Sequence, residues 1–242
     1  MNAEGNTPAR LAVVAIDGPS GSGKSSVAKG VARALGLAYL DTGAMYRAMT
    51  WWLIAHDIDV ADAAAVAARA GDAVIESITD PDSPAIRADG EDVSQAIRDH
   101  DVTERVSLVS AVPEVRDQMV ALQRDIAASS RASGRGIVLE GRDIGTAVLP
   151  DADTKVFLIA DAKVRAARRA AEDGQSGRPD LGVEHTEAQL KRRDALDSGR
   201  RTSPLKQASD AVAVDSSTLT LDEVIATVVD LVRSDAGEGA TQ

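Results

Sequence analysis

An eight-residue loop near the start of the chain carries side chains whose types and spacing suit phosphate binding. Residues 18–25 read GPSGSGKS and match the pattern G-x-x-x-x-G-K-[S/T] at every fixed position. Glycines let backbone N–H groups turn inward around phosphate oxygens, where a Cβ would intrude. The lysine supplies a positive charge for the β- and γ-phosphates, and the hydroxyl after it is a ligand for Mg²⁺. The motif predicts a site for a nucleoside triphosphate.

The expected nucleotide contacts follow from this loop. They are Gly18, Pro19, Ser20, Gly21, Ser22, Gly23, Lys24, Ser25 and Ser26. Ser25 is the expected Mg²⁺ ligand, with most of the remaining coordination coming from the nucleotide and from water. A flexible glycine-serine linker would need neither the lysine nor an apolar strand directly before it, and the sequence contains both.

A parallel sheet with flanking helices is expected to position the loop. The apolar run at residues 11–17 has the length of a strand buried on both faces, and a helix is expected over 24–35 with Gly36 as its stop. Further strands are expected at 37–43, 136–140, 154–160 and 210–217. Further helices are expected at 44–57, at 106–129 with a break near Pro113, and at 220–234. Thr220 and Glu223 form a capping box at the start of the last of these. Residues 162–201 are expected to form two helices joined by a polar turn. This alternation predicts an α/β fold.

A smaller unit interrupts the alternation. From about residue 57 the sequence is rich in alanine and acidic residues, and its Asp-Pro, Ser-Pro and Asp-Gly pairs indicate short strands joined by tight turns. We interpret residues 62–103 as an inserted subdomain. Residues 1–10 and 234–242 are expected to be flexible tails.

The composition excludes several classes of function. The 242-residue chain has no cysteine, which excludes disulfides and thiolate sites, and its three histidines are too scattered for a metal cluster. Aromatic residues make up 2% of the chain, too few for platforms that stack nucleic-acid bases. No apolar run has the length of a membrane span or a signal-peptide core. We expect a cytoplasmic protein without nucleic-acid or membrane partners, and nothing demands more than a monomer.

The net charge of −11 argues against binding to a polyanion but not against a small phosphate ligand. Residues 57–104 hold 13 acidic and 3 basic side chains, so the rest of the chain is nearly neutral and arginines recur through its second half. We interpret the acidic stretch as solvated surface. The distribution is compatible with an arginine-lined cleft for phosphates.

The loop alone leaves several reaction classes open. A GTPase should carry an Asn-Lys-x-Asp sequence to read guanine, and the chain contains no Asn-Lys pair. A motor ATPase needs a track or subunit interfaces, for which nothing in the sequence argues. A phosphotransferase must also hold an acceptor opposite the γ-phosphate.

Five segments resemble the bacterial cytidylate kinases in order and spacing. They are IDGPSGSGKSSVAK at 16–29, YLDTGAMYRA at 39–48, LEGRDIGTAVLPDADTKVFLIAD at 139–161, RRDALDSGR at 192–200 and DAVAVDSSTLT at 210–220. The resemblance extends over about residues 12–232. It implies transfer of the γ-phosphoryl group from MgATP to CMP or dCMP. It also implies a kinase domain at 11–233 that has three parts. The P-loop NTPase-type core comprises about residues 11–61, 104–160 and 205–233. A monophosphate-binding insert lies at 62–103 and a small lid at 161–204.

The resemblance assigns an acceptor site residue by residue. Its members are Asp41, Thr42, Arg47, Ser107, Arg116, Arg142, Asp143, Arg193, Asp197 and Arg200, and the catalytic set is Lys24, Arg142 and Arg200. Arg47 and Arg142 are expected on phosphate, and Ser107 and Arg116 on the base. Asp143 is expected to accept from the exocyclic amine of cytosine, because a carboxylate would repel the O4 of uracil. Arg193 and Asp197 are expected near the ribose.

Arginines ahead of the polar turn would supply the lid in this resemblance. Arg165 and Arg169 share one helix face and are assigned to ATP, while Arg168 and Arg178 are further candidates. Each of these arginines has an ordinary alternative as a solvated side chain. Other assignments have structural alternatives too, because Arg193 and Asp197 have the spacing of a helical salt bridge and Asp143 could be a helix N-cap.

Two residues depart from the family's usual pattern. Glu140 stands before GRD where aspartate is frequent, and Thr42 stands where serine is common. Both keep the functional group and alter its reach. The open alternatives to a CMP kinase are a kinase for UMP, AMP or shikimate, and a regulatory module that binds ATP without transferring phosphate.

Overall fold

The core of the protein is a five-stranded parallel sheet, which confirms the α/β prediction. A computed structural model describes residues 9–175, 182–200 and 202–238. The strand order is β2-β6-β1-β7-β8, and every neighbouring pair is parallel. The strands are β1 (Val13–Asp17), β2 (Ala38–Asp41), β6 (Ile137–Gly141), β7 (Thr154–Ile159) and β8 (Val212–Asp215). The phosphate loop follows the central strand β1.

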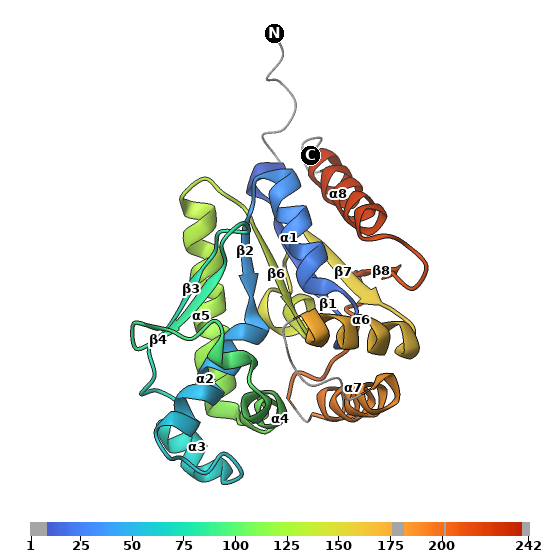
Figure 1. Cartoon of the computed structure of the whole chain (residues 1–242). Coiled ribbons are helices and arrows are strands. Elements are labelled where there is room, and N and C mark those ends of the chain that lie inside the picture. The colour runs from blue at the N-terminus through green and yellow to red at the C-terminus, as the bar shows by residue number, and fades with distance from the viewer. Residues whose placement is uncertain (1–8, 176–181, 201, 239–242) are drawn as a thin grey trace.

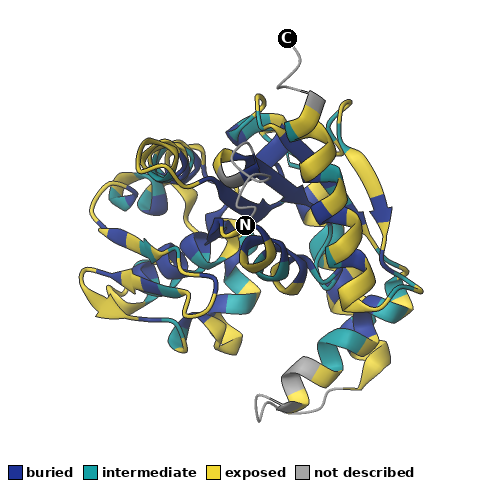
Figure 2. Cartoon of the chain, turned by 90° about the horizontal axis from the view of Figure 1, so that it is seen from above, coloured by how far each residue is buried: buried dark blue, intermediate teal, exposed yellow. Residues whose placement is uncertain are grey.

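Helices cover both faces of the sheet (Figure 1). Val13 and Ala15 of β1 belong to a core cluster that includes α2 (Thr42–Ala55) and α5 (Pro113–Ala132). Val14 and Ile16, which alternate with them, belong to a second cluster with α1 (Lys24–Leu35) and α8 (Leu221–Glu238). Every residue of β1 is therefore buried, as expected for a strand between two layers (Figure 2).

Local signals explain where these helices begin and end. α1 spans the expected residues and ends at Gly36, which has a φ of 69°. The expected strand over 37–43 is shorter, because Asp41 accepts a hydrogen bond from the Ala44 N–H at 2.9 Å and starts α2 at Thr42. The capping box at α8 is confirmed, since the Thr220 N–H donates to Glu223 Oε2 at 2.8 Å.

The inserted region contains a small antiparallel sheet. It holds α3 (Ala63–Arg69), β3 (Ile75–Ile78), β4 (Ala85–Ala88), β5 (Glu91–Asp92) and a short helix η2 (Ala96–Arg98), and α4 (His100–Val109) follows it. Asp89 lies in the β4–β5 turn with a φ of 50°, and its carboxylate accepts from Trp52 Nε1 at 2.6 Å. This bond ties the turn to α2.

The second half of the chain adds the helices that face the phosphate loop. A short helix η3 (Ile144–Val148) follows β6, and α6 (Ala162–Gln175) follows β7. α7 (Val183–Ser198) packs against α6. The predicted polar turn between them, including Arg178, lies mostly outside the described residues. No helix in the described part of the chain is long and apolar enough to cross a membrane.

Asp17 connects the central strand to the loop that carries Arg142 and Asp143. It is 5% exposed and accepts from the backbone N–H groups of Ile144 and Gly145, both at 2.8 Å. Burial raises the pKa of Asp17 to about 6, although these two hydrogen bonds oppose the shift. The carboxylate thus fixes the start of η3 and, with it, the two residues before it.

Replacing Asp17 should reveal a pH-dependent contribution to stability. The carboxyl group titrates near 3.8 in the unfolded chain and near 6 in the folded protein, so in this window the folded protein keeps a proton that the unfolded chain has released. Stability therefore falls as pH rises through the window. We expect the unfolding free energy of the wild type, relative to Asp17→Asn, to fall by about 2 to 3 kcal/mol between pH 4 and 7. Urea unfolding of both proteins across this range measures it, and a difference independent of pH would contradict the assignment.

Candidate active site

The phosphate loop is pressed against the sheet in a conformation that requires glycine. Gly18 has a φ of 151°, and a Cβ there would lie 2.1 Å from the carbonyl oxygen of Leu158 on β7. Gly21 and Gly23 have φ values of 76° and 89°. α1 begins at Lys24, directly after the loop. The positive end of this helix and its free N–H groups therefore face the loop, which is the arrangement that binds phosphate elsewhere.

The lysine of the motif is folded into its own loop. Lys24 Nζ donates to the carbonyl oxygen of Pro19 at 2.7 Å and lies 3.5 Å from Ser22 Oγ. Burial lowers the pKa of Lys24, and the nearby Arg142 adds to this shift, while Glu140 and Asp17 oppose it. The ammonium group is thus positioned within the loop and partly balanced by two carboxylates.

Asp197 on α7 brings two of the predicted arginines together. Arg142 donates from Nε to Asp197 Oδ2 at 2.8 Å and from Nη1 to the Gly18 carbonyl oxygen at 3.1 Å. Arg200 donates to the other oxygen of Asp197 and, at 2.9 Å, to Ser110 Oγ. Burial would raise the pKa of Asp197, but the two arginines hold it below its usual value. Asp197 therefore pairs with these arginines, and the alternative of a helical salt bridge to Arg193 is not what the described structure shows.

Further arginines lie near this pair. The Nε atom of Arg193 is buried and has no hydrogen-bond partner in the described part of the chain. Burial lowers the pKa of Arg193 to about 10, with Arg142 as the next cause. The pKa of Arg47 is lowered by burial and then by Arg193 and Arg169. Like charges raise each other's energy here, which is the condition that an incoming anion relieves.

Two of the three residues predicted to read the base form a buried ion pair. Arg116 on α5 donates to Asp143, and the two side chains are 3% and 7% exposed. Burial raises the pKa of Asp143, and Arg116 opposes that shift. Asp143 occupies the N-cap position of η3, as the alternative had it, but its side chain makes no capping hydrogen bond there. Ser107 is half-buried on α4, and its carbonyl accepts from Ser110 Oγ at 3.3 Å.

The predicted residues at the end of β2 help to shape the turn into α2. Asp41 caps the helix, and Thr42 Oγ1 donates to the backbone carbonyl oxygen of Glu140 at 2.7 Å. Arg47, one turn later, donates to Ile97 O at 3.2 Å and to Thr103 Oγ1 at 2.9 Å. Their predicted contact with CMP remains a prediction.

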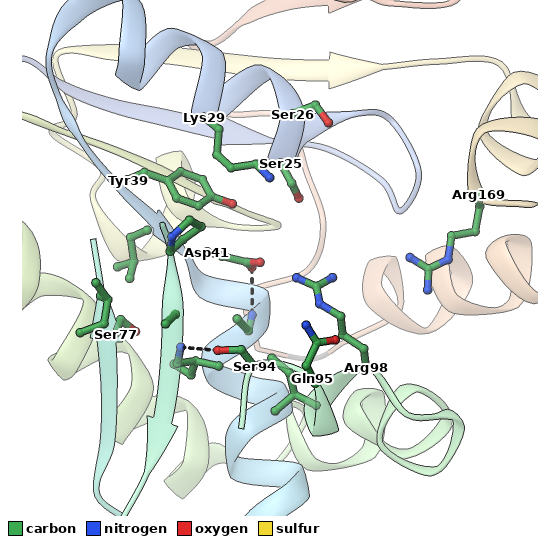
Figure 3. A pocket seen from close by; sticks show the side chains of 17 residues that line it. Ser25, Ser26, Lys29, Tyr39, Asp41, Ser77, Ser94, Gln95, Arg98 and Arg169 are labelled. Atoms are coloured by element: carbon green, nitrogen blue, oxygen red, sulfur yellow. Dashed lines mark hydrogen bonds between the residues drawn. The ribbon is translucent and has the colours of Figure 1, made fainter. Parts of the chain in front are cut away.

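The arginines of α6 have different surroundings. Arg165 is buried under the phosphate loop, where it donates to Ser20 O at 2.8 Å and to Asp194 Oδ2 at 2.6 Å. Arg168 donates to Ser216 O at 2.6 Å and Ser216 Oγ at 3.0 Å. Arg169 points toward the space in front of α1 (Figure 3). Contact with ATP remains a prediction for Arg165 and Arg169, and only Arg165 is seen bracing the loop itself.

A cavity of about 460 Å³ lies between the start of α1 and the inserted region. The predicted residues Ser25, Ser26, Asp41 and Arg169 line it, together with Arg98 of η2 (Figure 3). Arg98, which ends the segment GEDVSQAIR of the insert, was missed by sequence reasoning. The cavity brings the phosphate loop, the β2 edge and the insert to one place.

Sequence reasoning also missed two acidic roles. Asp194 accepts from Arg165 and, through Oδ1, from the Ser20 N–H at 3.2 Å, so it braces the loop. Glu140, noted only as a departure, is buried at the carboxyl end of β6 beside Lys24 and Ser25. Burial raises its pKa, and the neighbouring Asp41 adds to that shift. A carboxylate at the end of a buried strand next to a phosphate loop was the signal for this position.

Comparisons with known proteins show the family of the chain. The family described as cytidylate kinase matches residues 14–234. A cytidylate kinase of Streptomyces griseus is 58% identical over 91% of this chain and 92% of its own length. One of Nocardia farcinica is 51% identical over 95% of this chain and 97% of its own length.

Among solved structures, an uncharacterised protein from Eubacterium ventriosum is similar in fold. It has a TM-score of 0.52 at 12% identity, with 93% of this chain and 99% of that chain covered. That likeness concerns the fold alone, whereas the family match and the two relatives span nearly the whole sequence. The chain belongs to the cytidylate kinase family.

Proposed function

We propose that the protein transfers the γ-phosphoryl group of MgATP to CMP or dCMP, giving CDP or dCDP and ADP. The observation that carries the choice of acceptor is the buried Arg116–Asp143 pair, which lies at the sheet edge that also carries the phosphate loop. A carboxylate and a guanidinium side by side match the edge of cytosine, which presents an amine donor next to acceptors. The names of the relatives support the same acceptor.

The acceptor phosphate would lie among the arginines. Arg47, Arg142, Arg193 and Arg200 contribute positive charge, and a single carboxylate, Asp197, bridges two of them. An acceptor phosphate would balance part of the positive charge of these arginines. Because the acceptor is already an anion, the reaction needs no strong general base. Positioning and electrostatic stabilisation of the transferred group supply the catalysis.

The residues at the start of α1 fit a magnesium ion. Ser25 offers a hydroxyl and Glu140 a carboxylate, and hard oxygen donors of this kind suit Mg²⁺. No group of three or more His, Asp or Glu side chains that could hold a metal occurs in the described ranges, so the nucleotide and water would supply the other ligands. When bound, the metal neutralises charge on the β- and γ-phosphates.

Closure of the site belongs to the same proposal. The insert at 62–103 and the lid region at 161–204 would approach the core on binding, exclude water and so suppress hydrolysis of ATP. Arg98 and Arg169, which line the cavity from these two regions, would then approach the phosphates. All of these residues come from one chain, so the proposal is for a monomer that acts on small substrates in the cytoplasm.

The proposal is tested by supplying MgATP with one acceptor at a time. We expect ADP release with CMP and dCMP, and little with UMP, AMP or shikimate, because only cytosine matches both members of the Arg116–Asp143 pair. A coupled assay for ADP measures turnover. ADP release that is equal with and without an acceptor would make the protein an ATPase and would contradict the proposal.

Removing the ammonium group from the loop should slow the chemical step. We expect Lys24→Ala to lower kcat by roughly 10²- to 10³-fold, the size of effect seen when a preorganised charge donor is lost. Lys163→Ala, an exposed lysine on α6, is the control and should keep its activity. Steady-state kinetics with CMP measure both variants, and near-normal turnover of Lys24→Ala would rule out the assigned role.

Neutralising Asp143 should weaken the choice between CMP and UMP. The amide of Asp143→Asn can donate to the O4 of uracil, whereas the carboxylate repels it. We expect the ratio of kcat/KM for CMP to that for UMP to fall by roughly tenfold to a hundredfold, the discrimination of one good base contact. Asp151→Asn, at an exposed site beyond η3, serves as the control. An unchanged ratio would mean that Asp143 does not read the base.

A further inference from the structure

One of the two tyrosines of the chain reaches the metal side of the phosphate site from the hydrophobic core. Tyr39 lies on β2 and is 2% exposed, and its ring belongs to the core cluster formed with α1 and α8. Its hydroxyl donates to Glu140 Oε1 at 2.5 Å. Figure 3 shows the same hydroxyl directed toward Ser25 and the space in front of α1. The proposed reaction gives this side chain no direct contact with a substrate.

Glu140 needs a partner to hold its side chain in one position. It is 4% exposed, and the strand register sets it beside Asp41, a second carboxylate. Hydrogen bonds from neutral hydroxyls to a carboxylate are short and strong. Tyr39 therefore anchors one oxygen of the Glu140 side chain at this position.

The shape of the two side chains explains why a tyrosine is suited to this task. A glutamate side chain has one more freely rotating bond than an aspartate side chain, so its carboxylate needs an external anchor. A tyrosine ring has two side-chain torsions, and here core packing fixes both. With Oε1 bonded to Tyr39, Oε2 is left for the side of the site that holds Ser25.

We propose that Tyr39 is a positioning residue for the magnesium ion: its hydroxyl orients the Glu140 carboxylate toward the metal that Ser25 and the nucleotide share. The inference rests on the proposed function, because it takes Glu140 and Ser25 as the metal side of the ATP site. Partners of this kind, which bind a ligand side chain rather than the metal, set the orientation and affinity of metal sites.

The test measures metal affinity directly, without turnover. The probe is Mn²⁺, titrated into the full-length protein saturated with a non-hydrolysable ATP analogue, with free Mn²⁺ followed by electron paramagnetic resonance. The variants are Tyr39→Phe, Glu140→Gln and the double variant. Tyr46→Phe is the matched control, because it removes the other tyrosine hydroxyl of the chain, which has no hydrogen-bond partner in the described structure.

We expect Tyr39→Phe to raise the Mn²⁺ dissociation constant by roughly tenfold or more. The double variant should bind Mn²⁺ no more weakly than Glu140→Gln alone, because Tyr39 acts through Glu140. Affinity for the metal-free nucleotide and the melting temperature of the Tyr46→Phe control should stay as in the wild type.

Three results would overturn the inference. They are an unchanged Mn²⁺ affinity in Tyr39→Phe, an equal loss in Tyr39→Phe and Tyr46→Phe, and a further loss in the double variant beyond that of Glu140→Gln. If Glu140→Gln itself left Mn²⁺ affinity unchanged, the metal role of Glu140 would fail as well. Transfer to CMP is tested separately by the acceptor assay. A failure of the proposed role of Tyr39 can therefore be distinguished from a failure of the proposed function.

Discussion

The site depends on how the positive charge of its clustered arginines is balanced by negative groups. Arg47, Arg142, Arg193 and Arg200 meet at the carboxyl edge of the sheet, where burial strengthens their mutual repulsion. Asp197 relieves part of it by pairing with Arg142 and Arg200. The base-reading pair follows the same logic, since Arg116 and Asp143 balance each other in the absence of a ligand. In the proposed function, substrate binding would be an exchange of partners, in which phosphate and cytosine replace contacts between protein side chains, rather than the burial of unpaired charges.

The fold supplies the rigidity that such an exchange requires. The buried strands β1 and β6 lie side by side, so the loop after β1 and the Arg142–Asp143 turn after β6 emerge at one edge. Asp17 at the end of β1 holds the turn after β6 in place by accepting hydrogen bonds from two of its backbone N–H groups. Asp194 on α7 and Arg165 on α6 bond to each other and support the phosphate loop. In the proposed function, side chains and the flanking regions would move on binding, while the braced backbone of the phosphate loop would stay in place.

Most of the core could be predicted from sequence because its signals are local. The apolar run before the loop predicts a buried strand, and the glycines predict the loop conformation and the end of α1 at Gly36. The structure shows β1, the loop and the end of α1 at these places. The partners of the charged residues were less predictable. Asp197 has the spacing of a bond to Arg193 but pairs with Arg142, 55 residues away. Arg165 has the position of a lid residue but bonds to the phosphate loop. The partner of each charged residue depends on which helices the tertiary fold brings together, and this cannot be predicted from spacing along the sequence.

The central claim is that the Arg116–Asp143 pair opens to read cytosine, and a structure with CMP bound tests it most directly. A crystal structure of the protein with CMP and an inert ATP analogue would show both residues at once. The account predicts that Asp143 accepts from the N4 amine of the base, that Arg116 turns toward O2 and N3, and that the phosphate lies against Arg142. An intact Arg116–Asp143 ion pair, with CMP bound elsewhere in the cleft, would contradict it.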